Sequence, residues 1–286
     1  MNYFNQANLT TLITGLEVEG FDFHIHAIGD RGITESVDAI AAARATNNDN
    51  SVRHRITHLE IVRKSDIDRF DDFNITADMQ VTGDFTQPAN WNETDFLLGS
   101  ERTDSIVSLK AFYNAGARVV LSSDWDVSDL NPSVGMQNAL TRAPQNLPTL
   151  AAAIEAYTID ATYVMRQEDK VGSIEVGKLA DLIVLDQYLT TISITAIKAT
   201  NVLVTMIGGI IVYRACNNQN LTINGAIAQD SIYTTTGSIV SNATIANGKR
   251  IEMLAKEKVE LQEKFEAPQT STLYVSMDEC RNKIPE

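Results

Sequence analysis

Short stretches of alternating apolar and polar residues recur along the first half of the chain, and each is followed by a segment with helical spacing. In FDFHIH, residues 21–26, aromatic and aliphatic side chains alternate with polar ones, which is the period of a strand whose two faces differ. The chain then breaks at Gly29 and continues as ITESVDAIAAAR, in which apolar residues recur at helical spacing. The pattern predicts a strand over 21–26 and a helix over 32–45.

The same order of strand and helix continues to about residue 165. The patterns predict further strands over 54–58, 74–81 and 117–122, and further helices over 65–72, 102–115, 133–142 and 149–165. Gly116 stands where the helix over 102–115 should end. Short strands that alternate with helices are typical of an α/β fold with a parallel sheet.

From residue 172 the pattern changes to strands without helices between them. The run GSIEVGKLADLIVLD predicts a turn and a buried strand, and VLVTMIGGIIVY predicts two short strands around Gly208 and Gly209. The last stretch repeats short strands, such as SIVSNATI and STLYVSMDE, and predicts a β-rich appendage. We therefore expect three segments, over 1–171, 172–215 and 216–286.

Three of the predicted strands end in residues that bind metals. His26, His58 and Asp124 each stand at or just after the carboxyl end of a strand, where parallel α/β folds place their chemistry. One histidine at such a place would more often be a packed residue, but the recurrence favours a shared site. Neutral imidazoles and a carboxylate are ligands for zinc or a similar divalent metal, and a carboxylate beside metal-bound water can serve as a general base.

Several motifs then resemble the amidohydrolase superfamily, and within it the YtcJ-like, amidohydrolase type 3 branch. They are HAIGDRG, RITHLE, LSSDWDV, ALTRAP, AYTIDAT and GKLADLIVLD, and they span roughly residues 5 to 213 in the order of the family. A complete (β/α)₈ barrel takes about 250 residues, whereas the barrel-like part here ends near residue 165. The resemblance thus implies strands five to eight of a TIM barrel and part of a small β-sandwich.

The resemblance also implies that some metal ligands lie on strands that this chain lacks. The first strand of the family carries an HxH pair, and the fourth carries a carboxylated lysine or an equivalent ligand. The string HIH at 24–26 looks like that pair, but AIGDR follows it and marks the fifth strand. We therefore expect only His26 to be a ligand. His24 shares its strand face but lies about 7 Å deeper, as a supporting or core residue.

By resemblance, His26 and His58 would bind the second, more solvent-exposed position of a divalent metal site, zinc above all. Asp124 would contact the first metal and act as general base toward the bridging water. The substrate would be a small amide, carbamate, urea-like or N-acyl compound. The cleaved carbon–nitrogen bond would be a non-peptide one.

Three further residues are candidates to position that substrate: Gln80, Arg102 and Trp91. A surface or structural role is an equal alternative for Gln80 and Arg102, and the loop that holds Trp91 is either a lid or a solvated surface loop. Asp30 and Arg31 are expected to fix the loop after His26, because an Asp that follows Gly suits a turn.

Charge and cysteine content limit the partners and the compartment. The formal net charge of −14 argues against nucleic acid and anionic membrane surfaces. No apolar run reaches the roughly 18 residues of a membrane-spanning helix. Cys216 and Cys280 flank the last segment and suit either a disulfide in an exported protein, whose signal would precede residue 1, or two free thiols in the cytoplasm.

Three functions stay open at this point. The chain is the carboxyl-terminal half of a metal-dependent hydrolase, a catalytically incomplete fragment that serves as a structural or binding module, or a secreted adhesive protein defined by its last segment. The retained ligands indicate that the chain derives from a metal-dependent hydrolase. The absent HxH pair favours a catalytically incomplete fragment for the chain by itself. Open strand edges in a half-barrel further predict a homodimer or pairing with the missing half.

Overall fold

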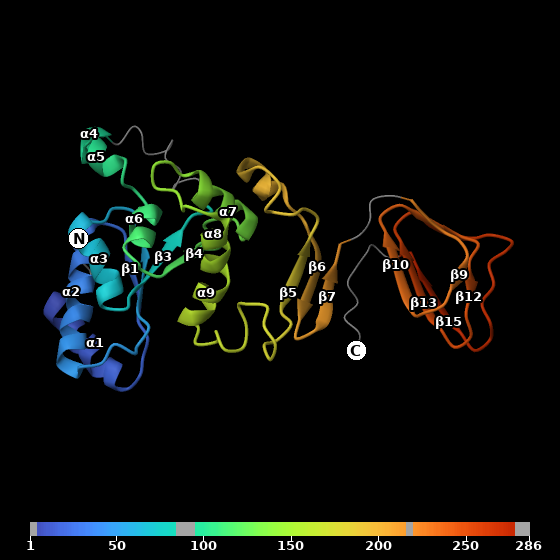
Figure 1. The fold of residues 1–286 in the computed structure, drawn as a ribbon, viewed down its shortest axis with the longest axis horizontal. Coiled ribbons are helices and arrows are strands. Elements are labelled where there is room, and N and C mark those ends of the chain that lie inside the picture. The colour runs from blue at the N-terminus through green and yellow to red at the C-terminus, as the bar shows by residue number, and fades with distance from the viewer. Residues whose placement is uncertain (1–4, 84–94, 216–219, 278–286) are drawn as a thin grey trace. The chain divides into compact units, whose positions relative to one another are not determined.

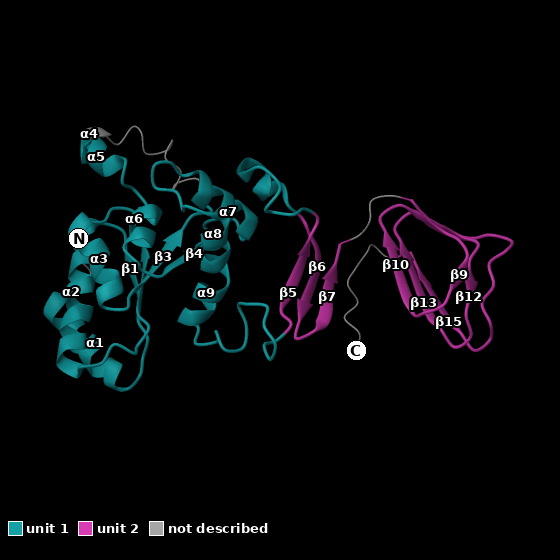
Figure 2. Ribbon diagram, in the orientation of Figure 1, with its two compact units in different colours: residues 1–179, 187–200 teal, residues 180–186, 201–286 magenta. Residues whose placement is uncertain are grey.

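The computed structural model describes residues 5–83, 95–215 and 220–277. Figure 2 shows the two compact units of the chain, residues 1–179 with 187–200 and residues 180–186 with 201–286. Among the described residues, none of the helices has the length and apolar character needed to span a membrane. The boundaries of the three predicted segments differ from those of the two compact units. That the three segments are separate domains stays a prediction.

The first unit is built on a parallel sheet of four strands in sequence order. The strands are β1 (His24–Ala27), β2 (Arg55–His58), β3 (Thr76–Gln80) and β4 (Val119–Ser122). In Figure 1, α1 to α3 lie on the β1 side of this sheet and α7 to α9 on the β4 side. The mixed α/β fold with a parallel sheet agrees with the prediction.

The helices of the first unit follow the predicted order, with two exceptions. They are α1 (Gln6–Val18), α2 (Asp30–Asn47), α3 (Lys64–Asp72), α4 (Asp95–Leu98), α5 (Ser100–Thr103), α6 (Leu109–Asn114), α7 (Pro132–Thr141), α8 (Leu150–Tyr157) and α9 (Ile159–Val164), with a 3₁₀ helix η4 (Ile194–Ala199).

The two exceptions are predicted helices that the structure breaks. The prediction of one helix over 102–115 is wrong. Val107 is buried, donates its backbone N–H to the Glu60 carbonyl and has a φ of 51°, which is outside helical geometry. The helix over 149–165 divides at Thr158, whose φ of −120° and ψ of −95° interrupt it.

The sheet of the first unit has one apolar and one polar face. Residues paired in register point to the same side of a sheet. The apolar face packs into the core and contains Ile25, Ile56, Ala77, Met79 and Leu121. The other face is mostly polar and contains His24, His26, Arg55, Thr57, Asp78, Gln80 and Ser122. Of the predicted site residues, His26 and Gln80 therefore lie on the polar face, whereas His58 ends β2 in register with Ala27.

A buried charged network joins α1, α2 and the segment before β2. Glu17 Oε1 lies 2.8 Å from His54 Nε2 and 3.0 Å from Arg44 Nη1. The Phe23 backbone N–H donates to His54 Nδ1 at 3.0 Å, so this nitrogen is an acceptor and the proton sits on Nε2. The network thus holds His54 neutral, and burial lowers the pKa of its ring.

Acidification is expected to weaken the fold through His54. The unfolded ring binds a proton below a pH of about 6.5 while the folded ring stays neutral, so the free energy of unfolding falls as the pH drops through that value. We expect wild type to lose about 1 kcal/mol more than His54→Gln between pH 7.5 and 5.5. Urea unfolding at the two pH values measures this, and equal losses in both proteins would refute it.

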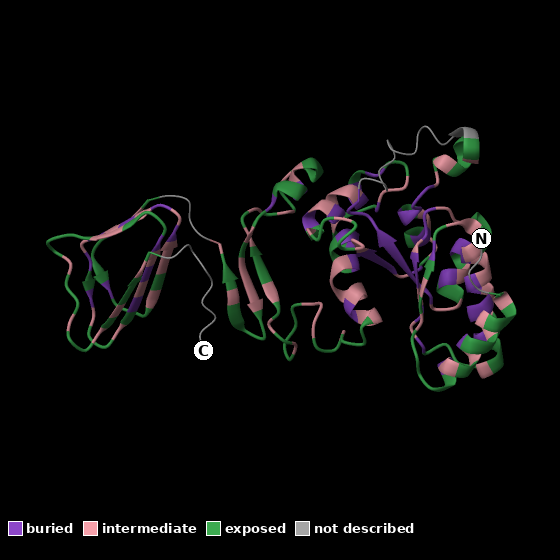
Figure 3. Ribbon diagram, turned by 180° about the vertical axis from the view of Figure 1, so that it is seen from behind, coloured by how far each residue is buried: buried purple, intermediate pink, exposed green. Residues whose placement is uncertain are grey.

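The second unit begins with a small antiparallel sheet. It consists of β5 (Leu182–Leu185), β6 (Val202–Ile207) and β7 (Ile210–Arg214). The predicted pair of strands around Gly208 and Gly209 is confirmed, and both glycines have the positive φ that a two-residue hairpin turn requires. Figure 3 shows exposed and half-buried residues along these strands. The exposed apolar residues include Ile183, Ile207 and Ile210.

The rest of the second unit is a parallel β-solenoid. Its strands are β8 (Leu221–Ile223), β9 (Ala226–Ile227), β10 (Ser231–Thr235), β11 (Ser238–Ser241), β12 (Thr244–Ile245), β13 (Arg250–Ala255), β14 (Lys258–Leu261) and β15 (Thr272–Ser276). Leu221, Ile239 and Val259 stack in register, so successive coils return after 18 and 20 residues. The buried core includes Ile239, Ile251 and Met253. The β-rich prediction agrees with this segment, although the solenoid itself was not predicted.

Candidate active site

Two of the predicted ligands, His26 and His58, meet at the carboxyl ends of neighbouring strands. His26 Nδ1 lies 3.1 Å from His58 Nε2, and the ring centroids are 4.9 Å apart in an edge-to-face arrangement. Two imidazole nitrogens bound to one tetrahedral zinc at about 2.05 Å lie about 3.3 Å from each other. The two nitrogens lie at hydrogen-bond distance, and this separation is also compatible with a shared metal.

The end of β2 holds His58 in an unusual backbone conformation. His58 and the fully buried Leu59 have φ values of 79° and 57°, which residues other than glycine rarely adopt. Hydrogen bonds from Leu59 N to Ala27 O and from Ile61 N to Ile28 O tie this turn to the end of β1. Such local strain is found at functional sites, where the surrounding structure maintains it.

Glu60 contacts the other side of the His58 ring and was not predicted as a site residue. Its Oε1 lies 3.3 Å from His58 Nδ1, and its side chain is buried. The hydrogen bond with Glu60 raises the pKa of His58; burial opposes it, while the charges of Glu60 and Asp124 add to it. The sequence signal that could have identified Glu60 is its place two residues after His58, a predicted ligand.

Asp124 follows β4, and its φ of 54° again departs from ordinary strand geometry. After the hydrogen bond with Glu60, the charge of Asp124 is a smaller contribution to the raised pKa of His58. Within residues 5–83, 95–215 and 220–277, however, no three or more His, Cys, Asp or Glu side chains are grouped to hold a metal ion. The structure thus brings His26 and His58 together, while the role of Asp124 as a third ligand and base stays a prediction.

His24 belongs to a polar cluster next to the histidine pair, not to the apolar core. Its Nδ1 lies 3.1 Å from Arg55 Nη2, and its Nε2 lies 3.7 Å from Asp78 Oδ2. Asp78 also accepts a hydrogen bond of 2.6 Å from the Ser122 hydroxyl. Burial and then the charge of Arg55 lower the pKa of His24, whose ring lies 5.2 Å from that of His26.

The predicted substrate-positioning residues lie in different surroundings. Gln80 is buried on the polar face, and within the described structure its Oε1 has no hydrogen-bond partner. Arg102 donates to Asp30 Oδ2 at 2.9 Å and is therefore paired with the first residue of α2. Trp91 lies outside the described residues. The Arg31 backbone N–H donates to Asp30 Oδ1 at 2.8 Å in the first turn of α2, and the loop-fixing role of Asp30 stays a prediction. The substrate contacts of Gln80 and Arg102 stay predictions.

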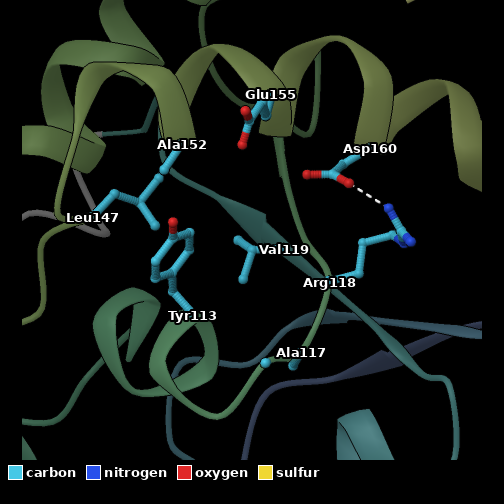
Figure 4. A pocket seen from close by; sticks show the side chains of 9 residues that line it. Tyr113, Ala117, Arg118, Val119, Leu147, Ala152, Glu155 and Asp160 are labelled. Atoms are coloured by element: carbon cyan, nitrogen blue, oxygen red, sulfur yellow. Dashed lines mark hydrogen bonds and ion pairs between the residues drawn. The ribbon is translucent and has the colours of Figure 1, made fainter.

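A cavity of about 300 Å³ lies at the opposite end of β4. In Figure 4, Tyr113, Val119, Leu147 and Glu155 are among the residues around it, and Arg118 forms an ion pair with Asp160. Burial raises the pKa of Asp160, and Arg118 opposes that rise. Because Arg118 precedes β4 and Asp124 follows it, this cavity is remote from the carboxyl ends of the strands, where chemistry is placed.

Comparison with known proteins gives one family and several relatives. A family model described as "Amidohydrolase family" matches residues 1–213. The protein LONG AFTER FAR-RED 3 of Arabidopsis thaliana is 29% identical over 219 residues, which are 70% of this chain and 36% of that protein. The N-substituted formamide deformylase of Arthrobacter pascens is 25% identical over 222 residues, which are 74% of this chain and 40% of that enzyme.

A solved structure shares the fold. It is an uncharacterized metal-dependent hydrolase from Pyrococcus horikoshii OT3, with a TM-score of 0.56 and 21% identity over 68% of this chain and 39% of that chain. This chain therefore spans about two fifths of the length of each of these three proteins.

Proposed function

Because the chain belongs to the amidohydrolase family, as its motifs predicted, we propose that it supplies the carboxyl-terminal, metal-binding part of a hydrolase that cleaves carbon–nitrogen bonds in small amide or N-acyl compounds. The observation that carries the proposal is the pair His26 and His58, whose ring nitrogens lie 3.1 Å apart. A relative named N-substituted formamide deformylase supports this substrate class.

We further propose that β1 to β4 correspond to strands five to eight of a (β/α)₈ barrel. Their parallel order in the sheet supports this correspondence. The β5–β7 sheet, with its exposed apolar residues, would be the matching part of a β-sandwich. Relatives extend well beyond the matched region, so the remaining strands and ligands would lie outside residues 1–286.

The donor set fits a divalent metal, and zinc suits two imidazole nitrogens. His26 would bind through Nδ1 and His58 through Nε2, since these atoms face each other. A bound metal supplies a Lewis acid that lowers the pKa of water and polarises a carbonyl. Two imidazoles leave further coordination positions to other ligands.

The chain's own residues would then move protons and orient the substrate. The Asp124 carboxylate would accept a proton from the attacking water and pass it to the leaving nitrogen. Gln80 Oε1, a buried acceptor that lacks a partner among the described residues, would accept a hydrogen bond from a substrate N–H group. The Asp30–Arg102 pair would hold the loop that follows β1.

Zinc binding by the isolated chain tests the proposal. We expect weak binding in calorimetry, because two protein ligands leave the site open. His26→Ala and His58→Ala should each weaken it at least about tenfold, which is 1.4 kcal/mol. His24→Ala is the matched control, because His24 lies on the same strand but faces Arg55, and it should retain the wild-type affinity. Stoichiometric zinc binding that survives both His26→Ala and His58→Ala would rule out the proposed site.

A further inference from the structure

We propose that Glu60 is a positioning residue that orients the His58 ring and selects Nε2 as its metal-binding atom. This inference rests on the proposed function. Glu60 is only 3% exposed, and its Oε1 lies 3.3 Å from His58 Nδ1, on the side of the ring away from His26. Glu60 itself does not face the second histidine, so its action on a metal would pass through His58.

The hydrogen-bonding groups determine which nitrogen is free. An ionised carboxylate only accepts hydrogen bonds, so His58 Nδ1 must carry the proton in this contact. A neutral imidazole has one N–H, and Nε2 is then left with its lone pair. That lone pair faces His26 Nδ1 at 3.1 Å, where a shared metal would lie. Carboxylates that hold the second nitrogen of a ligand histidine in this way increase metal affinity.

The surroundings of Glu60 keep a buried carboxylate at this position. Its backbone carbonyl accepts from Val107 N at 2.9 Å, and the neighbouring carbonyl of Ile106 accepts from Arg142 Nη2 at 3.1 Å. Arg142 is itself buried, and its charge interacts with that of Glu60. The guanidinium therefore offsets part of the cost of burying the carboxylate.

The second carboxylate oxygen of Glu60 forms no hydrogen bond with the described residues. This oxygen, Oε2, is buried. An unpaired buried acceptor destabilises a fold, and so it does not explain why a carboxylate stands here. The contact with His58 explains the carboxylate together with the charge of Arg142, because an acceptor at this place fixes the ring.

Two substitutions of Glu60 separate positioning from packing. Glu60→Leu removes the acceptor, whereas Glu60→Gln keeps an amide oxygen that can still accept from His58 Nδ1. We expect Glu60→Leu to weaken zinc binding about 10- to 100-fold and Glu60→Gln to recover part of that loss. Glu101→Gln is the control, because Glu101 is an exposed carboxylate paired with Lys64 and should bind zinc as wild type does.

Nitrogen-15 NMR of the metal-free protein gives a readout that packing alone would not change. We expect His58 to carry its proton on Nδ1 in wild type and in Glu60→Gln, and to shift toward the Nε2–H form in Glu60→Leu. Wild-type tautomer and wild-type zinc affinity in both variants would overturn the inference. If Glu60→Leu does not fold, the same two measurements on Glu60→Gln and on Glu60→Ala decide.

The failure of this inference differs from the failure of the proposed function. If His58→Ala weakens zinc binding and Glu60→Leu does not, the metal pair stands and only the role of Glu60 is wrong. If zinc binding responds to neither histidine, the proposed function fails, whatever the His58 tautomer is.

Discussion

Asp124→Asn is expected to lower the hydrolysis of an N-acyl amine by about 10²- to 10⁴-fold in a protein that completes this chain with the preceding strands of a relative. The amide keeps the size of the side chain but cannot accept the proton of the attacking water. Fusion of the amino-terminal part of a related hydrolase to this chain would provide such a protein. Release of the amine, measured under saturating zinc, reports the rate.

Asp126→Asn is the matched control for this substitution. Asp126 is an exposed carboxylate on the same loop, so its replacement changes the local charge by the same amount. We expect it to retain most of the activity. Hydrolysis that continues at the wild-type rate in Asp124→Asn would show that another group is the base. The isolated chain is expected to be inactive, because catalytic residues that act as one unit lose their activity together when some of them are absent.

The second large effect concerns stability. Glu17→Ala is expected to lower the free energy of unfolding by about 3–5 kcal/mol, because breaking a buried ion pair leaves an uncompensated charge. The charge left behind is Arg44, which is 6% exposed, and the His54 N–H group also loses its acceptor. Since the network joins α1, α2 and the segment before β2, the loss should affect the whole first unit.

Urea unfolding followed by circular dichroism measures this effect. Glu101→Ala is the control, because its pair with Lys64 is exposed and such pairs contribute about 0–1 kcal/mol. A cost for Glu17→Ala that is no larger than the cost for Glu101→Ala would mean that the buried network does not stabilise the fold.

The strands of the first unit could be predicted from local pattern. The alternation in residues 21–26 predicted a strand close to the observed His24–Ala27, and the histidine pair followed because parallel strands end at the same edge. The break between α5 and α6 could not be predicted in this way. It depends on the hydrogen bond from Val107 to Glu60, two residues that are remote in sequence.

Neither the solenoid nor the contact of Glu60 with His58 could be predicted from the sequence. The solenoid coils differ in length, 18 and 20 residues, and stack residues as different as Leu221, Ile239 and Val259, so no exact repeat appears in the sequence. Glu60 follows His58 by two residues, but its contact requires the left-handed backbone of His58 and Leu59, which residue type does not predict.

Zinc K-edge X-ray absorption on the zinc-loaded chain tests most directly whether His26 and His58 share one metal. The spectrum of the wild type is expected to show two imidazole ligands with zinc–nitrogen distances of about 2.0–2.1 Å. His58→Ala and His26→Ala should each retain one imidazole, and His24→Ala should retain both. A wild-type spectrum without imidazole scattering, or one that neither His26→Ala nor His58→Ala alters, would contradict the account.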